Sequence, residues 1–455
     1  MPVAAAIPIS LIPFGLAALL MTLAFGFYYR LRKTTSRLWS YIGLICFWIA
    51  YEYLHQTWDL AFPWMNLGNG FAESHRLIQW YEYTGVYGGT LWILTANLIA
   101  FELYVATQEE SKKVNILRGA LAAVVFIPIT ISLTIYGKYK EAVNPANIVV
   151  VQPNIDPYSK FGNIPAQEQV KTLIDLSKSV AQPNTEYFIW PETAIPEFTD
   201  EETVRSSPLY GTVQEFLNTY KNGNVLTGIE SYRLYDSAKT PTARHVEHLG
   251  KYADSFNAAV QIENSAKVQF YHKSKLVPGV EQLPFASALS FMKPLFAAFG
   301  GTTGGYGKDD EASVFYAQSG MGVAPIICYE SIWGEYVGES VRKGAQFIAI
   351  ITNDGWWGNT SGKDQHLAYA KLRALETRRW VARSANTGIS GFINQRGDVV
   401  KQSQWWVPAV LKADINLNEE LTFYVKHGDY IALVGCLGAG AFVIFILVAA
   451  ARKRE

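Results

Sequence analysis

Three reactive side chains follow apolar segments that are typical of buried β-strands. Glu192 follows "FIWP", Lys273 lies in "YHKSKLVPG" and Cys328 ends "PIIC". A thiol is a useful nucleophile only as the thiolate, and the ordinary pKa of a free cysteine is about 8.5. A carboxylate can take the thiol proton, and a lysine or a backbone N–H can hold the oxyanion of an attacked carbonyl. Together these residues predict acyl chemistry on a cysteine.

Each of the three residues has a simpler interpretation when it is taken alone. A carboxylate after a strand is most often a helix N-cap or a surface acid. A lysine near a strand end is usually solvated, and a cysteine in an apolar run is usually part of the core. The prediction therefore depends on the combination, and on the expectation that strand ends meet at one edge of an α/β sheet.

The other motifs exclude several competing kinds of site. Cys46 and Cys436 lie inside long apolar runs, and no cysteine or histidine spacing resembles a metal site or a disulfide framework. The sequence also lacks the GxSxG motif of serine hydrolases. We predict neither a metal nor a cofactor.

The composition is typical of a protein that lies partly in a membrane. The chain has 455 residues, of which 49% are hydrophobic, 14% aromatic and only 17% charged. Lys plus Arg and Asp plus Glu number 39 each, so no net charge favours nucleic acid as a partner.

Apolar segments at both ends of the chain are long enough to cross a membrane as helices, which takes about 20 residues. They run over residues 4–28, 38–60, 81–106, 116–135 and 429–451. We therefore predict a transmembrane helical domain at residues 1–140 with about four spans, a soluble domain at 141–427, and a C-terminal transmembrane helix with a basic tail at 428–455.

Basic residues predict the orientation of these helices, because Lys and Arg collect in cytoplasmic loops. They follow the first predicted span, the third and the last: Arg30, Arg32, Lys33, Arg37; Lys112, Lys113, Arg118; Arg452, Lys453, Arg454. All three groups lie on one side if residue 1 is outside the cytoplasm, and residues 141–427 then also lie outside. Lys138 and Lys140 weakly oppose this orientation.

The middle segment reads as an α/β domain. The predicted strands are "NIVVVQPNI", "TEYFIWPE", "NVLTGIESY", "DSFNAAVQIE", "AKVQFYHKSKL", "GVAPIICYE" and "QFIAIITND". Helices are expected at 166–180, 331–345 and 365–385, and a hairpin with a turn near Arg396–Gly397. The Gly-rich residues 292–307 are predicted to be a mobile lid, although a plain linker is nearly as plausible.

At this point five motifs, in order, resemble one superfamily. "WPETAIPE", "YHKSKLVPGVE", "IICYESIW", "TNDGWW" and "RALETRRWVARSANTGIS" are similar to the nitrilase, or carbon–nitrogen hydrolase, superfamily. The predicted membrane helices and "VQPNI" narrow the resemblance to the apolipoprotein N-acyltransferase family. The resemblance implies an αββα nitrilase-type sandwich inserted between transmembrane α-helices.

The resemblance also implies roles for individual residues. Glu192 would be the general base, Lys273 the oxyanion stabiliser and Cys328 the nucleophile. The residues implied or assigned as supporting or substrate-binding groups are Glu281, Tyr329, Glu330, Phe161, Asn257 and Trp357.

Two departures from the family pattern stand out. The family usually has seven helices before the catalytic domain, whereas four are predicted here, so helices upstream would be lacking. Phe161 occupies a place where the family often has tryptophan.

The function implied is transfer of a fatty acyl chain from a phospholipid, through a cysteine thioester, to the α-amine of an S-diacylglyceryl cysteine at the start of an apolipoprotein. The implied place is the bacterial inner membrane, with the catalytic domain on the periplasmic side. A membrane-tethered amidase or acyl hydrolase would use the same three residues and remains an alternative. A transporter or scaffold without catalysis is a weaker third hypothesis.

Other polar residues have two open interpretations. Asn353, Asp354, Trp356 and Trp357 could shape a pocket or simply form a strand-to-loop turn. Arg373, Glu376, Arg379 and Arg383 have helical spacing and favour an ion-pair network over substrate binding. Glu52 and His55 lie in a predicted span, where ionisable groups are costly and often functional.

Overall fold

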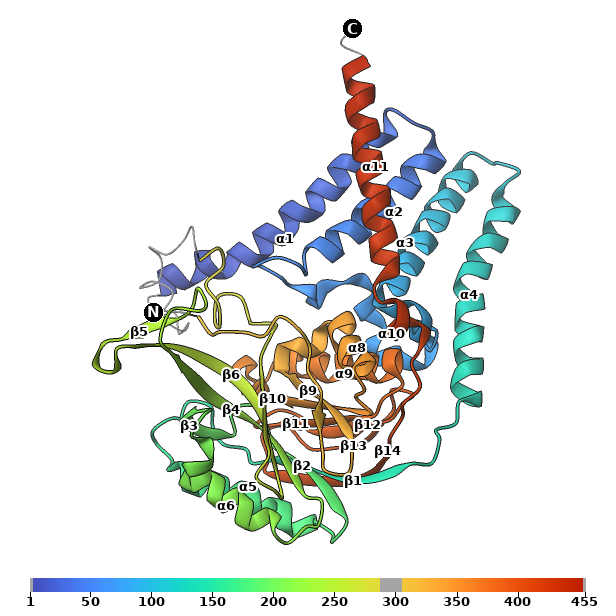
Figure 1. The fold of residues 1–455 in the computed structure, drawn as a ribbon. Helices are drawn as coiled ribbons and strands as arrows, with labels where there is room; N and C mark the ends of the chain where they lie inside the picture. Colours follow the sequence, from blue (N-terminus) through green and yellow to red (C-terminus); the bar gives the residue numbers. More distant parts are fainter. Residues whose placement is uncertain (1–2, 287–304, 453–455) are drawn as a thin grey trace. The chain divides into compact units, whose positions relative to one another are not determined.

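The computed structural model describes residues 3–286 and 305–452 (Figure 1). The chain divides into two compact units, one made of residues 1–137 and 427–455 and the other of residues 138–426. The predicted lid at 292–307 lies, apart from its last three residues, outside the described part.

The first unit is helical. Its elements are α1 (Val3–Arg32), α2 (Arg37–Leu54), η1 (Pro63–Met65), η2 (Leu67–Leu77), α3 (Tyr81–Gln108), α4 (Val114–Lys138) and α11 (Tyr430–Arg452). Within the described residues, four helical segments are long and apolar enough to cross a membrane: 13–32 of α1, and the whole of α3, α4 and α11. Helix α2 is not among them, and it ends at Leu54, before the predicted residue 60. Its 18 residues rise only about 27 Å.

The buried carboxylate of Glu52 has a structural role in this unit. It accepts hydrogen bonds from Trp48 Nε1 at 3.0 Å, from the backbone N–H of Leu67 at 2.8 Å and from Thr90 Oγ1 at 2.7 Å. Residue 67 begins η2 and Thr90 belongs to α3, so one carboxylate joins three elements. Its polar partners explain how an acid is tolerated among apolar helices.

Two β-sheets make up the second unit. The larger has the order β14-β1-β2-β4-β6-β5, with β3 paired to β4 and β7 to β6. Its strands are β1 (Pro145–Gln152), β2 (Thr185–Ile189), β3 (Ile195–Asp200), β4 (Asn224–Tyr235), β5 (Arg244–Val246), β6 (Lys251–Glu263), β7 (Val268–His272) and β14 (Ala409–Asn416). The smaller has the order β13-β12-β11-β10-β9-β8. It contains β8 (Phe315–Tyr316), β9 (Gly322–Ile327), β10 (Phe347–Thr352), β11 (Val381–Ala385), β12 (Gly391–Ile393) and β13 (Val399–Gln402).

The two sheets pack face to face because their central strands are apolar on both sides. All six residues of β9 and all six of β10 are buried, as expected for parallel strands covered on both faces. Strand β11 contacts β1 and β2 of the other sheet. The Tyr187 and Phe347 rings meet across this interface, with their centroids 5.4 Å apart.

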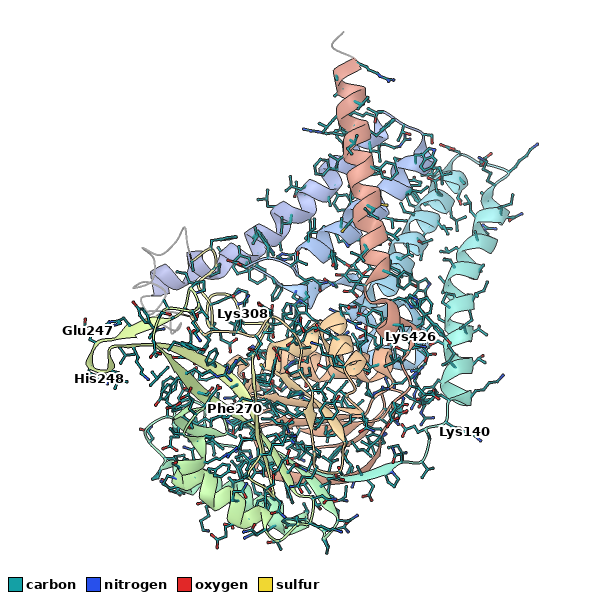
Figure 2. All side chains as sticks on the ribbon, in the orientation of Figure 1. Lys140, Glu247, His248, Phe270, Lys308 and Lys426 are labelled. Atoms are coloured by element: carbon teal, nitrogen blue, oxygen red, sulfur yellow. The ribbon has the colours of Figure 1, made fainter. Side chains whose placement is uncertain are left out.

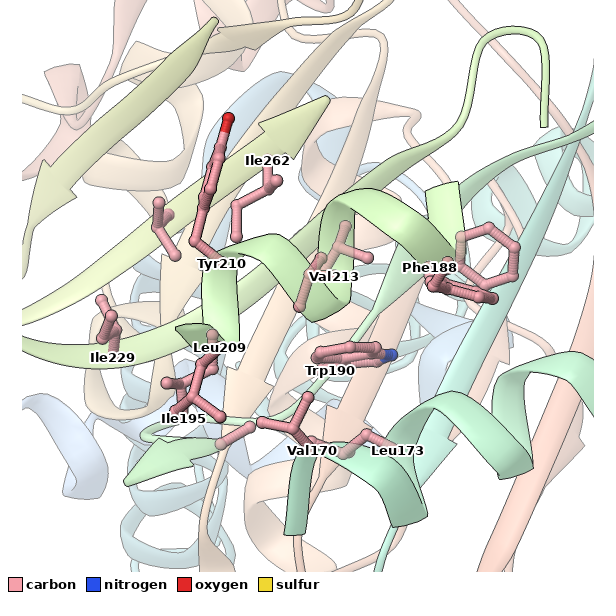
Figure 3. Packing of buried hydrophobic residues seen from close by; sticks show 14 of the residues in the cluster. Val170, Leu173, Phe188, Trp190, Ile195, Leu209, Tyr210, Val213, Ile229 and Ile262 are labelled. Carbon is pink, nitrogen blue, oxygen red and sulfur yellow. The ribbon is translucent and has the colours of Figure 1, made fainter. Parts of the chain in front are cut away.

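Helices cover the outer face of each sheet. Helices α5 (Ala166–Val180) and α6 (Pro208–Leu217) pack on the larger sheet, and α8 (Gly334–Arg342) and α9 (Ser361–Thr377) on the smaller one (Figure 1). Val170, Leu173 and Val213 of α5 and α6 meet Phe188 and Trp190 in the outer core of the larger sheet (Figure 3). The layers run α, β, β, α, which confirms the predicted sandwich.

The predicted helix at 365–385 is too long. Helix α9 ends at Thr377, and Arg378 follows in the left-handed region with a φ of 51°. Residues 381–385 form strand β11, which pairs in parallel with β10. The charged residues keep a helical spacing beyond Thr377, where α9 ends. The sheet nevertheless buries all five residues of β11, and this burial decides the local structure.

Two short helical turns also differ from expectation. Residues 328–332 form the 3-10 helix η6 (Cys328–Ile332), and the α-helix predicted from 331 begins only at Gly334. A second 3-10 turn, η7 (Asp354–Trp357), follows β10. The hairpin predicted near residue 397 is confirmed, because β12 and β13 are antiparallel and Gly397 has a φ of 87°.

The remaining short elements are η3 (Val204–Ser206), η4 (Glu247–Leu249) and α10 (Phe423–His427). Glu247 and His248 of η4 lie in the connection between β5 and β6 (Figure 2). Lys140 and Lys426, also labelled in Figure 2, lie near the two ends of the second unit.

Candidate active site

The reactive residues follow strands of both sheets. Glu192 lies just after β2, and Lys273 directly after β7. Strand β7 runs in the direction of β2, because β2 and β4 are parallel while β4–β6 and β6–β7 are antiparallel. Cys328 follows β9 of the smaller sheet. The expectation of neighbouring strand ends in one sheet is therefore wrong, since the site uses strand ends of both.

The ammonium of Lys273 lies between two carboxylates. Its Nζ donates to Glu281 Oε1 at 2.8 Å and to Glu192 Oε1 at 3.2 Å. Burial by itself would lower the pKa of Lys273, but Glu192 and Glu281 raise it well above its usual value. The two carboxylates therefore favour the protonated form of Lys273. An ammonium has three N–H donors, and the bonds to Glu281 and Glu192 use two of them among the described residues.

Asn257 of β6 joins the same two carboxylates. Its Nδ2 donates to Glu192 Oε1 at 2.9 Å and to Glu281 Oε1 at 2.8 Å. The backbone N–H of Lys273 donates to the Asn257 carbonyl at 2.9 Å. One asparagine therefore contacts both acids and the backbone of the lysine.

The carboxylates of Glu192 and Glu281 differ in which of their oxygens accept hydrogen bonds. Glu281 uses both, because Val277 N–H donates to Oε2 at 2.7 Å while Lys273 and Asn257 donate to Oε1. In the described part of the chain, the hydrogen bonds to the Glu192 side chain reach only Oε1. The Oε2 atom of Glu192 can therefore accept a proton without breaking a hydrogen bond.

Cys328 occupies a constrained turn and is partly exposed among buried neighbours. Its φ is 50°, in the left-handed region that residues other than glycine seldom adopt. Burial raises the pKa of the Cys328 thiol, and the Glu192 carboxylate raises it further, whereas Lys273 lowers it. Both charges therefore act on the sulfur, although their residues lie 136 and 55 positions earlier in the chain.

Glu330 holds the cysteine turn against the lysine loop. Its Oε2 accepts from the backbone N–H of Ile327 at 2.8 Å, and its Oε1 accepts from Ser274 N–H at 2.7 Å and from the Tyr271 hydroxyl. The pKa of Glu330 is raised to about 7, because burial raises it by more than these hydrogen bonds lower it. One carboxylate therefore joins the residue before Cys328 to the residue after Lys273.

The other predicted supporting residues lie around this centre. Tyr329 is buried, and its ring meets that of Trp333 edge-on at 4.8 Å. Phe161 is 46% exposed, and the Lys160 ammonium lies 5.8 Å from the centroid of its ring. Trp357 is half-buried and packs edge-on against the His366 ring at 5.2 Å.

Lys160 is a buried residue that the sequence analysis missed. Its Nζ donates to the Glu192 carbonyl at 3.0 Å and to Thr193 Oγ1 at 2.7 Å. Thr193 has a φ of 48°, so the lysine clamps a strained turn next to the acid. Burial lowers the pKa of Lys160 to about 7, against the raising effect of Glu192 and Glu230. In the sequence it looks like any polar loop lysine.

His366 of α9 was also missed. Its Nε2 lies 3.1 Å from the Cys328 carbonyl oxygen and 2.9 Å from Ser331 Oγ, and its Nδ1 lies 3.0 Å from Asp354 Oδ1. Arg383 Nη2 donates to Asp354 Oδ2 at 2.5 Å. In the sequence, only Asp354 pointed to this group of residues, and it could be interpreted either as a pocket residue or as part of a strand-to-loop turn.

The remaining arginines of this region are structural. Arg373 Nη2 pairs with Glu376 Oε2 at 2.8 Å, and both side chains are buried. Arg379 donates to the carbonyls of Ala345 and Glu420 at 2.9 and 2.8 Å. These contacts agree with the interpretation of an internal network.

Comparison with known proteins matches both units. Residues 147–420 match the carbon–nitrogen hydrolase family, and residues 2–99 match the apolipoprotein N-acyltransferase N-terminal domain. An apolipoprotein N-acyltransferase of Chlorobaculum tepidum is 32% identical over 437 residues, which cover 94% of this chain and 80% of that protein. One from Geobacter metallireducens is 28% identical over 406 residues, covering 88% and 72%.

Among solved structures, an amidase from Nesterenkonia sp. is 12% identical, covers 62% of this chain and 94% of its own, and has a TM-score of 0.41. The two family matches and the first relative cover most of the sequence. The chain therefore belongs to the apolipoprotein N-acyltransferase family, with its second unit in the carbon–nitrogen hydrolase family.

Proposed function

We propose that this chain transfers a fatty acyl chain from a phospholipid, through a thioester on Cys328, to the α-amine of the S-diacylglyceryl cysteine that begins an apolipoprotein. The observation that carries the proposal is the Lys273 ammonium held between Glu192 and Glu281, with its charge acting on the Cys328 thiol. The membrane-spanning helices and the named activity of the relatives support a lipid donor and an apolipoprotein acceptor.

The first half-reaction forms the thioester. Glu192 takes the proton of the Cys328 thiol, and the sulfur attacks the ester carbonyl carbon. The carbonyl oxygen becomes an oxyanion, which the Lys273 ammonium and the backbone N–H of Tyr329 stabilise. Collapse of this intermediate breaks the ester C–O bond. The leaving alkoxide takes the proton from Glu192 and departs as a lysophospholipid.

The second half-reaction forms the amide. The neutral α-amine of the acceptor attacks the thioester carbonyl, and Glu192 takes the proton that the nitrogen loses. Lys273 again faces the developing oxyanion. Collapse releases the Cys328 thiolate, which recovers the proton from Glu192. The enzyme therefore returns to its starting state, and no electrons are gained or lost.

A labelled donor tests the proposal directly. The full chain in lipid–detergent micelles is mixed with a phospholipid whose acyl chain is isotopically labelled, and intact mass is measured. We expect a mass increase of one acyl chain, mapped to Cys328, and its loss when a diacylglyceryl lipopeptide is added. Cys328→Ala should abolish both the adduct and the triacylated peptide, whereas Cys46→Ala and Cys436→Ala should keep both.

The same experiment separates transfer from hydrolysis. An adduct that decays to free fatty acid, with no acylated peptide formed, would replace the proposal with an acyl hydrolase. An adduct that persists in Cys328→Ala would contradict the assignment of the nucleophile.

We also propose that residues 138–426 lie on the extracytoplasmic side of the bacterial inner membrane. The support is the position of the basic residues. Arg32 ends α1, Lys112 and Lys113 lie between α3 and α4, and Arg452 ends α11. These positions belong on the cytoplasmic side by the positive-inside rule.

A further inference from the structure

The carboxyl end of β10 brings a hydroxyl to the candidate nucleophile. Strands β9 and β10 are parallel, with Ile326 opposite Ile350 and Ile327 opposite Ile351. The next residue of each strand end is Cys328 on one side and Thr352 on the other. Thr352 is completely buried, and a hydrogen bond from its hydroxyl is one of the influences that lower the pKa of the Cys328 thiol.

The same hydroxyl also donates to Asp354. Thr352 Oγ1 lies 2.8 Å from Asp354 Oδ1. A threonine hydroxyl has one hydrogen and two acceptor lone pairs. While its hydrogen is directed at Asp354, its oxygen can only accept from the S–H group. A thiolate would need that hydrogen for itself.

Asp354 can lose this hydrogen bond without becoming an unpaired buried charge. His366 Nδ1 lies 3.0 Å from Oδ1, and Arg383 Nη2 lies 2.5 Å from Oδ2. Burial by itself would raise the pKa of Asp354, but Arg383 and His366 lower it below its usual value. The carboxylate therefore stays ionised and keeps Arg383 as a partner when the hydroxyl turns away.

Among the residues that the structure describes, few groups other than Thr352 favour a thiolate at Cys328. The neighbouring carboxylates of Glu192 and Asp354 both disfavour a negative sulfur. The cation that favours it, Lys273, is shared with two carboxylates. A hydroxyl that can donate to the sulfur at the moment of proton loss would therefore lower the cost of forming the nucleophile.

We propose that Thr352 is a catalytic residue of this site, whose O–H turns from Asp354 to the Cys328 sulfur as Glu192 takes the thiol proton. This inference rests on the proposed role of Cys328 as nucleophile. The proton balance is complete, because the S–H proton moves to Glu192 and the hydroxyl hydrogen only changes its acceptor. No bond to carbon changes in this step.

His366 fixes the turn so that the sulfur stays within reach of the hydroxyl. Its Nε2 and Ser331 Oγ both lie near the Cys328 carbonyl oxygen, at 3.1 and 2.8 Å. Cys328 has a φ of 50°, a value that residues other than glycine seldom adopt unless neighbouring groups hold the backbone there. We regard His366 as a positioning residue, because it acts through the backbone.

The test compares Thr352→Val, which has the same shape without a hydroxyl, with Thr352→Ser, which keeps the hydroxyl. The full chain is alkylated with iodoacetamide across a pH series, and labelling of the Cys328 peptide is followed by mass spectrometry. The charged or titratable groups that act on the sulfur are Glu192, Lys273, Asp354 and Tyr329. They are the same in all variants, so a difference in midpoint reports the hydroxyl.

We expect Thr352→Val to move the alkylation midpoint upward by about one pH unit, which is roughly a tenfold loss of thiolate at a given pH. Thioester formation from labelled phospholipid should fall by about tenfold or more, and Thr352→Ser should restore both within about threefold. An unchanged midpoint and thioester rate in Thr352→Val would overturn the inference.

Two controls keep the result decisive. If thermal unfolding shows that Thr352→Val does not fold, Thr352→Ala replaces it, because removing atoms adds no steric conflict. The second control is the alkylation measurement itself, because it needs no lipid substrate. If the wild-type chain forms no thioester with phospholipid, the proposed function fails, while the midpoint comparison still judges Thr352.

Discussion

The position of Lys273 between Glu192 and Glu281 decides which group can serve as the base. Because the two carboxylates raise the pKa of Lys273, the lysine stays protonated and cannot take the thiol proton. Both oxygens of Glu281 already accept hydrogen bonds, one of them from the backbone of Val277. Glu192 is therefore the acid that the geometry favours as base, and Glu281 the one that positions Lys273.

Replacing Glu192 by glutamine should separate proton transfer from structure. The amide keeps the shape of the side chain but cannot take the thiol proton, so we expect thioester formation to fall by about 10²- to 10⁴-fold. The rate is measured from labelled phospholipid, and the unfolding temperature should change little. Glu263→Gln, which changes another buried acid of the same sheet, is the control and should retain the rate.

Lys160 gives a prediction about pH. The pKa of Lys160 is lowered to about 7 in the fold, below its ordinary value of 10.5. The unfolded chain therefore binds more protons between about pH 7 and 10.5, so this residue's contribution to stability increases with pH across that window. The unfolding temperature of the wild type, relative to Lys160→Met, should rise between pH 7 and pH 10.

The matched control for Lys160 is Lys171→Met, because the Lys171 side chain is 75% exposed. Its unfolding temperature relative to the wild type should show no comparable trend over the same pH range. A flat difference for Lys160→Met as well would mean that the lysine keeps an ordinary pKa in the fold.

At the scale of elements, strand β4 packs directly against the turn that carries Glu192. Gly228 donates its N–H to the Pro191 carbonyl at 3.0 Å. A Cβ at Gly228 would lie 2.6 Å from Glu192 Cα and 2.3 Å from Thr193 N. Any side chain at position 228 would collide with the backbone of Glu192, so only glycine fits there.

Gly228→Ala should therefore displace Glu192 as well as strain the sheet. We expect a loss of thioester formation of at least about tenfold, because small misplacements of catalytic groups are costly. Gly211→Ala in α6 is the control, since its Cβ would meet nothing within 4 Å. That variant should be as stable as the wild type or more stable.

The turn between β9 and α8 depends on Glu330 in a similar way. Glutamine at this position has one oxygen, whereas Glu330 accepts from Ile327 N–H with one oxygen and from Ser274 N–H with the other. Glu330→Gln should lower the free energy of unfolding by about 1–3 kcal/mol, because a buried donor is left without its acceptor. Denaturant or thermal unfolding of the full chain measures this effect.

The control for Glu330 is Glu339→Gln on α8, whose carboxylate pairs with the partly exposed Lys343 at 2.8 Å. An exposed pair of this kind contributes only about 0–1 kcal/mol. An equal effect of the two substitutions would contradict the role of Glu330 in joining the cysteine turn to the lysine loop.

At the scale of the whole molecule, the side of the membrane on which the catalytic unit lies depends on how many helices cross. With α1, α3, α4 and α11 as spans, helix α2 decides the parity, because it lies between Arg32 and η1 and has only 18 residues. The basic residues predict that α2 does cross. Residues 33–36 and 138–426 should then lie on opposite sides.

Single cysteines test this topology in a background in which Cys46, Cys328 and Cys436 are all replaced by alanine. A membrane-impermeant thiol reagent applied to intact cells with a permeabilised outer membrane should label Ala266→Cys in the catalytic unit. It should leave Ser36→Cys unlabelled until the inner membrane is broken. Both positions are exposed, so access depends on the membrane. Labelling of both in intact cells would contradict the crossing of α2.

The sequence by itself determined the organisation of the chain and its chemical candidates. Apolar runs marked the helices and the strands around Ile148, Ile326 and Ile350, because continuous hydrophobic segments must be buried whatever surrounds them. Glu192, Lys273 and Cys328 could be singled out because their motifs are local and because each follows such a segment.

Only the tertiary structure decided how these residues act on one another. Residues 381–385 look helical locally, yet they form β11 because the sheet offers burial on both faces. Lys160 and His366 had no distinctive motif, since their roles come from hydrogen bonds to residues 32 and 38 positions away. Burial also sets which groups stay charged, and burial is a property of the packed fold and not of any short stretch of sequence.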